Sequence, residues 1–243
     1  MENAGLDDLW TESGLYATNT TASMLEGKAY YRAVRAHRLT YEALWTIKWP
    51  MFETWLQEND YMEDLDIKRL VQKVSGQFCK NARRAEVSNA VDDLTKALSD
   101  HQIQECLELF DNQNKENPNF QMWKAYMKMV EILLAFIRAE REGNWRLHLE
   151  AFTAMLPWLT IYDHTNYARC CPIYLSDMEC LEKEAPQVYD ELMSGNFVVK
   201  RSKRPFNQVS AKSRKCYPIH AIAQNASQVY QSQLTLIPRF DGV

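Results

Sequence analysis

The clearest pattern in the chain is an apolar stretch from Met122 to Ala139 with few charged positions. The charged residues recur at spacings of four, three and seven, which places them on one narrow stripe of a helix. They are Lys124, Lys128, Glu131 and Arg138. The pattern predicts a helix that is buried on most of its circumference and ends at Gly143, since glycine adopts the left-handed conformation easily. If the helix is central, Leu133→Ala or Phe136→Ala costs about 2–5 kcal/mol.

Two further helices follow the same spacing. In the first, apolar residues recur every three or four positions, and Pro157 is expected to kink or stop it. These residues are Trp145, Leu149, Phe152, Leu156 and Leu159. The second begins after a corner at Asp163-His164, and its apolar residues are Tyr167, Cys171, Tyr174, Met178 and Leu181. A short helix from Pro186 to Ser194 should come next, with proline at its first position.

The first half of the chain predicts a series of shorter elements. Residues 1–22 have little apolar periodicity and are expected to be loosely held. A helix should run from about residue 23 to Lys48, be interrupted at Pro50 and continue briefly. Helices over 67–78, 87–98 and 103–110 should follow, with Ser99-Asp100 capping the last. A polar loop is expected at 111–119, and Asn119 is a candidate cap for the central helix.

Composition favours a mostly α fold, because glycine (7) and proline (8) are scarce and helix-forming residues dominate. We expect an irregular multi-helix bundle with a short β segment near 197–200 and a poorly ordered C-terminal tail. The predicted divisions are an N-terminal helical subdomain (1–110), a central helical core (119–195) and a basic, largely irregular tail (196–243). The chain shows no bilayer-spanning apolar run and no signal peptide, and its cysteines follow no C-x-x-C pattern. A nuclear or cytoplasmic protein with free thiols and no membrane association is expected.

Charge is distributed unevenly along the chain. Residues 1–191 hold 20 Lys/Arg and 31 Asp/Glu, whereas residues 192–240 hold 8 Lys/Arg and no acid. This basic arm predicts phosphate contacts with nucleic acid, or a two-part nuclear-import signal, and a solvated tail is the plainer interpretation. The candidate binding residues are Lys200, Arg201, Lys203, Arg204, Lys212, Arg214 and Lys215. A second basic stripe, Lys28, Arg32, Arg35 and Arg38, is better explained as a solvated face with Arg38 paired to Glu42.

Candidate metal ligands are limited to Asp163, His164 and Asp177. A metal-dependent nuclease needs acidic ligands that converge on one or two divalent ions. Asp177 should lie roughly 20 Å along a continuous helix from the Asp163 corner, so helix capping explains Asp163 better. His37 falls on an apolar face, which favours a hydrogen-bonded core histidine over a ligand. The sequence predicts no catalytic residue, no metal site and no small-molecule cofactor.

Several separated segments of the sequence resemble the sequences of one protein family. In chain order they are GKAYYRAVRAHRLT, EGNWRLHLEAFTAMLPWLTIYDHTNYAR, PIYLSDM and GNFVVKRSKRPFNQV. In this order they resemble an uncharacterised family of animal proteins associated with mobile elements, whose longer members have a transposase-like core of ribonuclease-H type. The resemblance spans most of residues 5–209. The chain departs from it at Cys170, where tryptophan is usual, and after Val209, where an acidic segment is expected.

The resemblance implies a helical protein derived from a mobile element. The sequence lacks the part expected to hold the first catalytic carboxylates, so our first hypothesis is a non-catalytic protein that binds nucleic acid or a protein partner. The second is a remnant of a metal-dependent nuclease or transposase that uses Asp163, His164 and Asp177. The third is a truncated product with no selected function.

Overall fold

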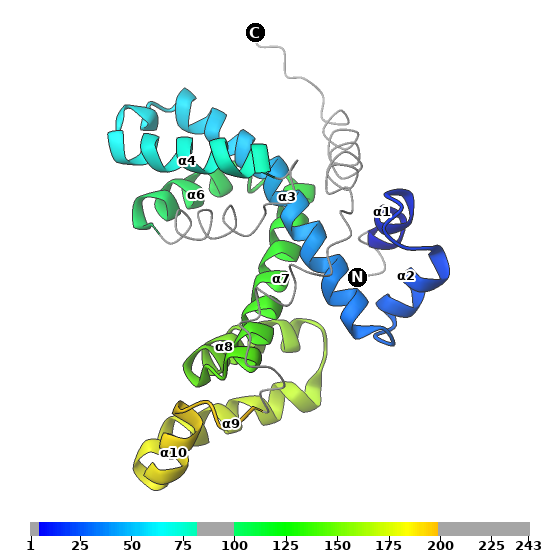
Figure 1. Ribbon diagram of the computed structural model, residues 1–243, viewed down its shortest axis with the longest axis vertical. Coiled ribbons are helices and arrows are strands. Elements are labelled where there is room, and N and C mark those ends of the chain that lie inside the picture. Colours follow the sequence, from blue (N-terminus) through cyan, green and yellow to red (C-terminus); the bar gives the residue numbers. More distant parts are fainter. Residues whose placement is uncertain (1–4, 82–99, 199–243) are drawn as a thin grey trace. The chain divides into compact units, whose positions relative to one another are not determined.

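A computed structural model describes residues 5–81 and 100–198. Within these ranges the chain forms nine α-helices and no strand, which confirms the mostly α prediction (Figure 1). The helices are α1 (Leu6–Glu12), α2 (Thr18–Leu25), α3 (Tyr30–Glu58), α4 (Leu65–Asn81), α6 (His101–Gln113), α7 (Pro118–Glu142), α8 (Trp145–Ile161), α9 (Thr165–Glu184) and α10 (Pro186–Met193), with a 3₁₀ turn, η2 (Tyr61–Glu63). The predicted helix over 87–98 and the C-terminal tail lie outside the described residues.

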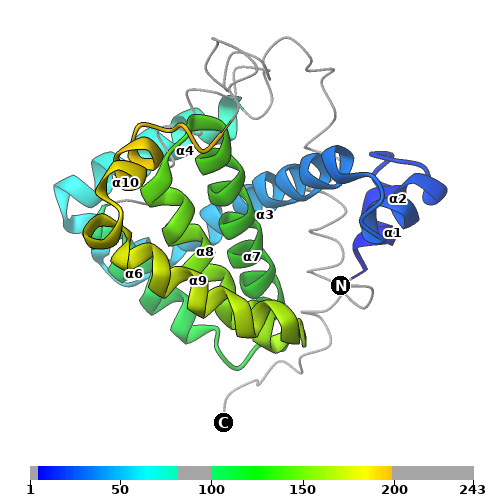
Figure 2. The same cartoon turned by 90° about the horizontal axis from the view of Figure 1, so that it is seen from below.

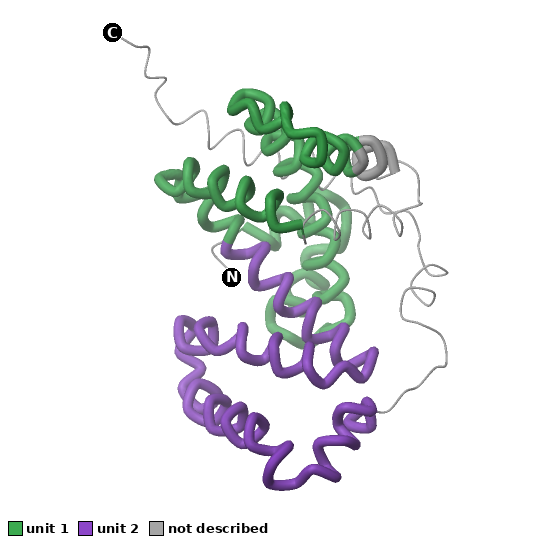
Figure 3. Tube along the Cα trace, turned by 90° about the vertical axis from the view of Figure 1, so that its left-hand side faces the viewer, with its two compact units in different colours: residues 1–124, 215–243 green, residues 125–214 purple. Residues whose placement is uncertain are grey.

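The chain divides into two compact units (Figure 3). Of the described residues, 5–81 and 100–124 belong to unit 1, and 125–198 belong to unit 2. The division falls inside α7, so one helix contributes its first turns to unit 1 and the rest to unit 2.

The expectation that residues 1–22 are loosely held is wrong for the described part, because residues 5–22 include α1 and most of α2. Leu6 and Trp10 of α1 are fully buried, and the Trp10 indole Nε1 donates a hydrogen bond to Thr40 Oγ1 of α3 at 2.8 Å. The Trp10 ring also meets His37 edge-on, with centroids 5.0 Å apart. A helix of seven residues shows too few apolar repeats to stand out in the sequence, and its stability comes from this packing.

Helix α3 runs through Pro50 without a break, contrary to the predicted interruption. Proline removes one backbone hydrogen bond, which leaves a carbonyl one turn earlier without its usual partner. Pro50 lies on the exposed side of α3, where water can satisfy that carbonyl. Two more prolines lie in helix interiors of the described chain, Pro157 in α8 and Pro172 in α9; both are exposed in the same way, and both helices continue through them.

On both sides of Pro50, α3 packs aromatic residues against α4 and α6. Trp49 and Phe52 are fully buried, and Phe52 contacts the ring of Phe110 in α6 at 5.7 Å. Val71 and Val74 of α4 are also buried. The predicted cap of α6 is confirmed, because Asp100 Oδ1 accepts hydrogen bonds from the backbone amides of residues 102 and 103.

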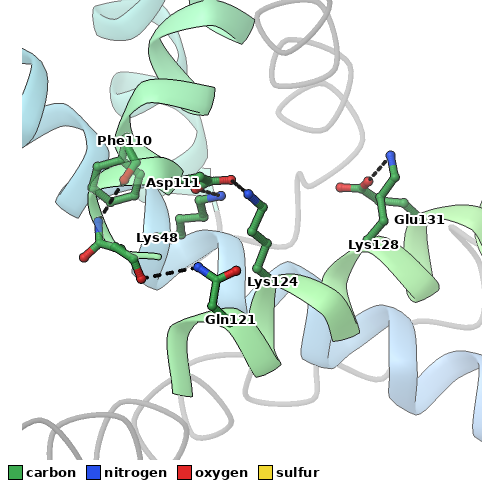
Figure 4. A network of polar contacts seen from close by, with 8 residues as sticks. Lys48, Phe110, Asp111, Gln121, Lys124, Lys128 and Glu131 are labelled. Atoms are coloured by element: carbon green, nitrogen blue, oxygen red, sulfur yellow. Dashed lines mark hydrogen bonds and ion pairs between the residues drawn. The ribbon is translucent and has the colours of Figure 1, made fainter. Parts of the chain in front are cut away.

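The polar loop that the sequence predicts over 111–119 is shorter in the structure and spans residues 114–117. Helix α6 continues to Gln113, and Asp111 is buried between Lys48 Nζ at 2.7 Å and Lys124 Nζ at 3.2 Å (Figure 4). This bridge joins α3, α6 and the first turns of α7. Asn117, not Asn119, caps α7, since its Oδ1 accepts from the amides of Asn119 and Phe120.

In unit 2, α7 has the buried face and the charged stripe that the sequence predicts. Lys128 pairs with Glu131 at 3.5 Å and Arg138 with Glu142 at 3.0 Å. Leu133 and Phe136, however, are only half-buried, and the buried residues of this part are Tyr126, Met127, Val130, Ile132, Ile137 and Ala139. Truncating Leu133 or Phe136 should therefore cost less than the 2–5 kcal/mol expected for a fully packed site.

Helices α8, α9 and α10 lie against one another in unit 2, as Figure 2 shows. A similar three-residue segment follows each of α7 and α10. These segments are Gly143-Asn144-Trp145 and Gly195-Asn196-Phe197. Both glycines have positive φ (68° and 85°), and a Cβ on Gly195 would lie 2.9 Å from the carbonyl oxygen of Gly143. Trp145 and Phe197 meet edge-on at 5.1 Å. The predicted β segment at 197–200 is wrong for its described part, since Phe197 and Val198 form a turn and a bend.

Candidate functional site

The N-terminal part of unit 1 contains an open hollow of about 550 Å³. It is lined by Tyr16, Thr20, Tyr31, Arg32 and Arg35. Tyr16 lies in the turn between α1 and α2, Thr20 lies in α2, and the other three lie in the first turns of α3. We call this feature the basic hollow, because its described lining carries two positive charges and no negative charge.

Local structure explains how these elements meet. The Trp10 carbonyl accepts hydrogen bonds from the amides of Leu15 and Tyr16, which turns the chain sharply after α1. Leu15, Thr21 and Met24 are buried, so the turn and α2 are held in place by packing. Buried residues of this turn and of α2 therefore hold in place the backbone that carries Tyr16 and Thr20.

The two arginines of the basic hollow lie on one face of α3. Residues three apart on a helix have Cβ atoms about 5–6 Å apart, so Arg32 and Arg35 can contact neighbouring anionic groups of one ligand. Two further cations of the stripe lie outside this lining: Lys28 pairs with Glu26 at 2.6 Å, and Arg38 with Glu42 at 3.4 Å. The predicted Arg38–Glu42 pair is thus confirmed, whereas Arg32 and Arg35 line a concave surface that the sequence did not predict.

A second polar cluster lies in unit 2, around His148. Its Nδ1 lies 2.7 Å from Glu140 Oε1, and its Nε2 lies 3.4 Å from the Tyr174 hydroxyl. Because an ionised carboxylate only accepts hydrogen bonds, Nδ1 is the donor to Glu140, and in the neutral imidazole Nε2 is then the acceptor that faces the Tyr174 hydroxyl. Burial, and next the charge of Glu140, raise the pKa of Tyr174, so its phenol stays protonated. The cluster joins α7, α8 and α9.

Aromatic rings surround the His148 imidazole. Trp145 and Phe152 stack on it with centroids at 5.0 and 5.8 Å, and Phe197 meets it at 5.6 Å and 64°. His148 therefore stabilises the packing of α7, α8 and α9 through its hydrogen bonds and ring contacts. His148 was not among the candidate residues predicted from the sequence. Its spacing of three residues from both Trp145 and Ala151, which are buried in α8, is the signal that places it on the same covered face.

The three candidate metal ligands do not form a site. Asp163 is exposed in the left-handed region (φ 55°), directly after α8, and Asp177 is exposed twelve residues into α9. No group of three His, Cys, Asp or Glu side chains in the described ranges could hold a metal ion. The capping interpretation of Asp163 is also wrong. Its backbone completes the end of α8, since the amides of Asp163 and His164 donate to the carbonyls of Thr160 and Leu159.

His37 lies on the buried side of α3, as predicted for a core histidine. Burial lowers its pKa from 6.5 to about 4, so the ring is neutral at physiological pH. The residues of the basic arm, from Lys200 to Lys215, lie outside the described residues. Among the described helices, none has the length and apolar content that crossing a bilayer requires.

A comparison with protein families matches residues 1–212 to a family described as a domain of unknown function, DUF8702. Searches of curated proteins and of solved structures find no match. The matched range includes the basic hollow, the His148 cluster and five of the seven candidate binding residues of the basic arm. Since it covers far more than half of the 243 residues, the chain belongs to the DUF8702 family.

Proposed function

We propose that the protein is a non-catalytic nucleic-acid-binding protein that contacts phosphates through the basic hollow. The main support is the pair of guanidinium groups, Arg32 and Arg35, on one face of α3 in a concave surface. Arginine suits phosphate because its planar fork donates two parallel hydrogen bonds. The hydroxyl groups of Thr20 and Tyr31 in the same lining can also donate to phosphate oxygens.

The basic arm supplies a second set of phosphate contacts in this proposal. Its seven cations follow one another within residues 200–215 without an acid between them. An arm that neutralises about six phosphates loses roughly a thousandfold in affinity between 50 and 200 mM salt, because each contact releases condensed counterions. A mobile-element origin, as the resemblance implies, is in keeping with a nucleic-acid ligand.

The basic hollow is tested by measuring the binding of a fluorescent oligonucleotide to the full chain across this salt range. Arg32→Gln with Arg35→Gln should weaken binding and reduce the slope of log affinity against log salt by up to about 2. Arg69→Gln is the matched control, because this exposed arginine of α4 lies 4.0 Å from Asp66 and does not line the hollow. Equal binding by all three proteins would contradict the role of the hollow.

The arm is tested separately by replacing its seven cations with glutamine in the full chain. Weaker binding with a reduced salt slope supports phosphate contacts. Unchanged binding, together with loss of nuclear accumulation of a fluorescent fusion, would assign the arm to nuclear import. If the intact chain binds no nucleic acid at low salt, a protein partner becomes the better explanation.

A further inference from the structure

The first turn of α3 leaves two tyrosine rings exposed. Tyr31 is 75% exposed and Tyr30 is 53% exposed, and their rings touch edge-on with centroids 5.5 Å apart. Burying an aromatic ring is favourable, so a ring left in water contributes little to folding. The exposed face of Tyr31 is instead available to a ligand, and Tyr31 is part of the lining of the basic hollow.

The same lining combines this ring with Arg32 and Arg35. Charged groups alone bind the phosphates of any nucleic acid, whether paired or single-stranded. An exposed aromatic ring adds a contact that only an unpaired base can use, since the bases of a duplex are already stacked on one another. A positively charged groove with aromatic rings along it is typical of proteins that bind single strands.

We propose that the basic hollow binds single-stranded nucleic acid, with one unpaired base stacked on Tyr31 and the adjoining phosphates held by Arg32 and Arg35. This inference rests on the proposed function and names the class of nucleic acid that the site takes. The volume of the hollow, about 550 Å³, lies within the range of pockets for small organic ligands and suits a single nucleotide unit. A duplex would contact the two arginines only.

The stacking contact predicts a selective effect of mutation. Loss of one base–aromatic stack lowers affinity about 5- to 150-fold. Tyr31→Ala should show this loss with a single strand and little change with a duplex. Tyr31→Phe keeps the ring and should bind the single strand nearly as well as the unaltered chain.

The experiment uses the full chain, a fluorescent oligothymidylate of about 12 nucleotides and a duplex of the same length. Tyr167→Ala is the matched control, because Tyr167 of α9 is also an exposed tyrosine (63%) and lies outside the hollow. Circular dichroism melting checks that each variant is folded. The expected result is tighter binding of the single strand, with a loss in Tyr31→Ala only.

Two results would overturn the inference and leave the proposed function standing. One is tighter binding of the duplex by the unaltered chain. The other is an equal effect of Tyr31→Ala on both probes, which would mean that the ring acts only on the shape of the hollow. Binding of neither probe would instead overturn the proposed function itself, and the inference with it.

Discussion

The two units are stabilised by different means. The largest fully buried side chains of the described chain all lie in unit 1, and they include Trp10, Trp49, Phe52 and Ile103. In unit 2, α9 buries only Cys171, and α10 buries no residue. Unit 1 therefore depends on apolar burial, whereas α8 to α10 depend on contacts at helix ends and on the rings around His148.

This difference shows that apolar content and burial can diverge. Helix α8 is rich in apolar residues, yet only Trp145, His148 and Ala151 are buried in it. Ile161 and Ile173, which lie at the end of α8 and in α9, remain 67% and 64% exposed. Apolar periodicity thus identifies the helices from α3 onward in the described part of both units, but it does not show how much of each helix is covered.

The largest effect is expected from removing a ring in the core of unit 1. Phe52→Ala should lower the free energy of unfolding by about 3–5 kcal/mol, because it leaves a cavity among Trp49, Trp55 and Phe110. Ile173→Ala in unit 2 should change it by less than about 0.5 kcal/mol. Urea denaturation of both variants measures the difference. Similar costs would show that the contrast between the units is wrong.

The glycine contact of unit 2 should give the next largest effect. Gly195→Ala combines a left-handed backbone, costing about 1–2 kcal/mol, with a clash against the Gly143 carbonyl, costing about 1–3 kcal/mol. Gly14→Ala in unit 1 is the control, since Gly14 also has positive φ (68°) but has no atom within 4 Å of the added Cβ. The difference between their denaturation midpoints isolates the clash. Equal midpoints would mean that the two chain segments can separate without cost.

Acid should weaken unit 1 through His37. The folded pKa of about 4 lies below the unfolded value of 6.5, so the unfolded chain takes up a proton first as pH falls. Stability is therefore unaffected at pH 7 and is lost between pH 6.5 and 4, by at most about 3 kcal/mol. Denaturation at several pH values should show a smaller loss for His37→Gln than for the unaltered chain. Parallel curves would exclude His37 as the cause.

The smallest effect is expected at the end of α8. Asp163→Gly should raise stability by about 0.5–1 kcal/mol, because glycine takes the left-handed conformation without a Cβ penalty. Asp60→Gly in unit 1, at φ 62°, should act in the same direction. Thermal melting measures both changes. A loss of stability in Asp163→Gly would show that the Asp163 side chain has a role that its exposed position does not reveal.

Much of the fold could be predicted from apolar spacing and helix-terminal residues. The ends of α7 and α10, the cap of α6 and the charged stripe of α7 all follow local rules. The errors arose where distant residues decide the outcome. Helix α1 depends on the Trp10 contact with Thr40, and Asp111 is helical and buried because two lysines reach it.

The candidate site was only half visible in the sequence. The arginines of α3 form a recognisable basic stripe, but their interpretation changes once Tyr16 and Thr20 are placed beside them. That placement depends on the packing of α1 and α2, which residue spacing does not reveal. The candidate ligands Asp163 and Asp177 do not form a metal site for a related reason. Acidic residues that lie in one region of the sequence need not converge in space.

The contact between Gly143 and Gly195 also limits how the protein can change over generations. Every substitution of glycine adds a Cβ, and at Gly195 this atom would meet the backbone of Gly143, which no exchange of side chain can move aside. A change at one position therefore has no simple compensating change at the other. Across variants of this protein, both positions should stay glycine while the exposed residues of α9 vary freely.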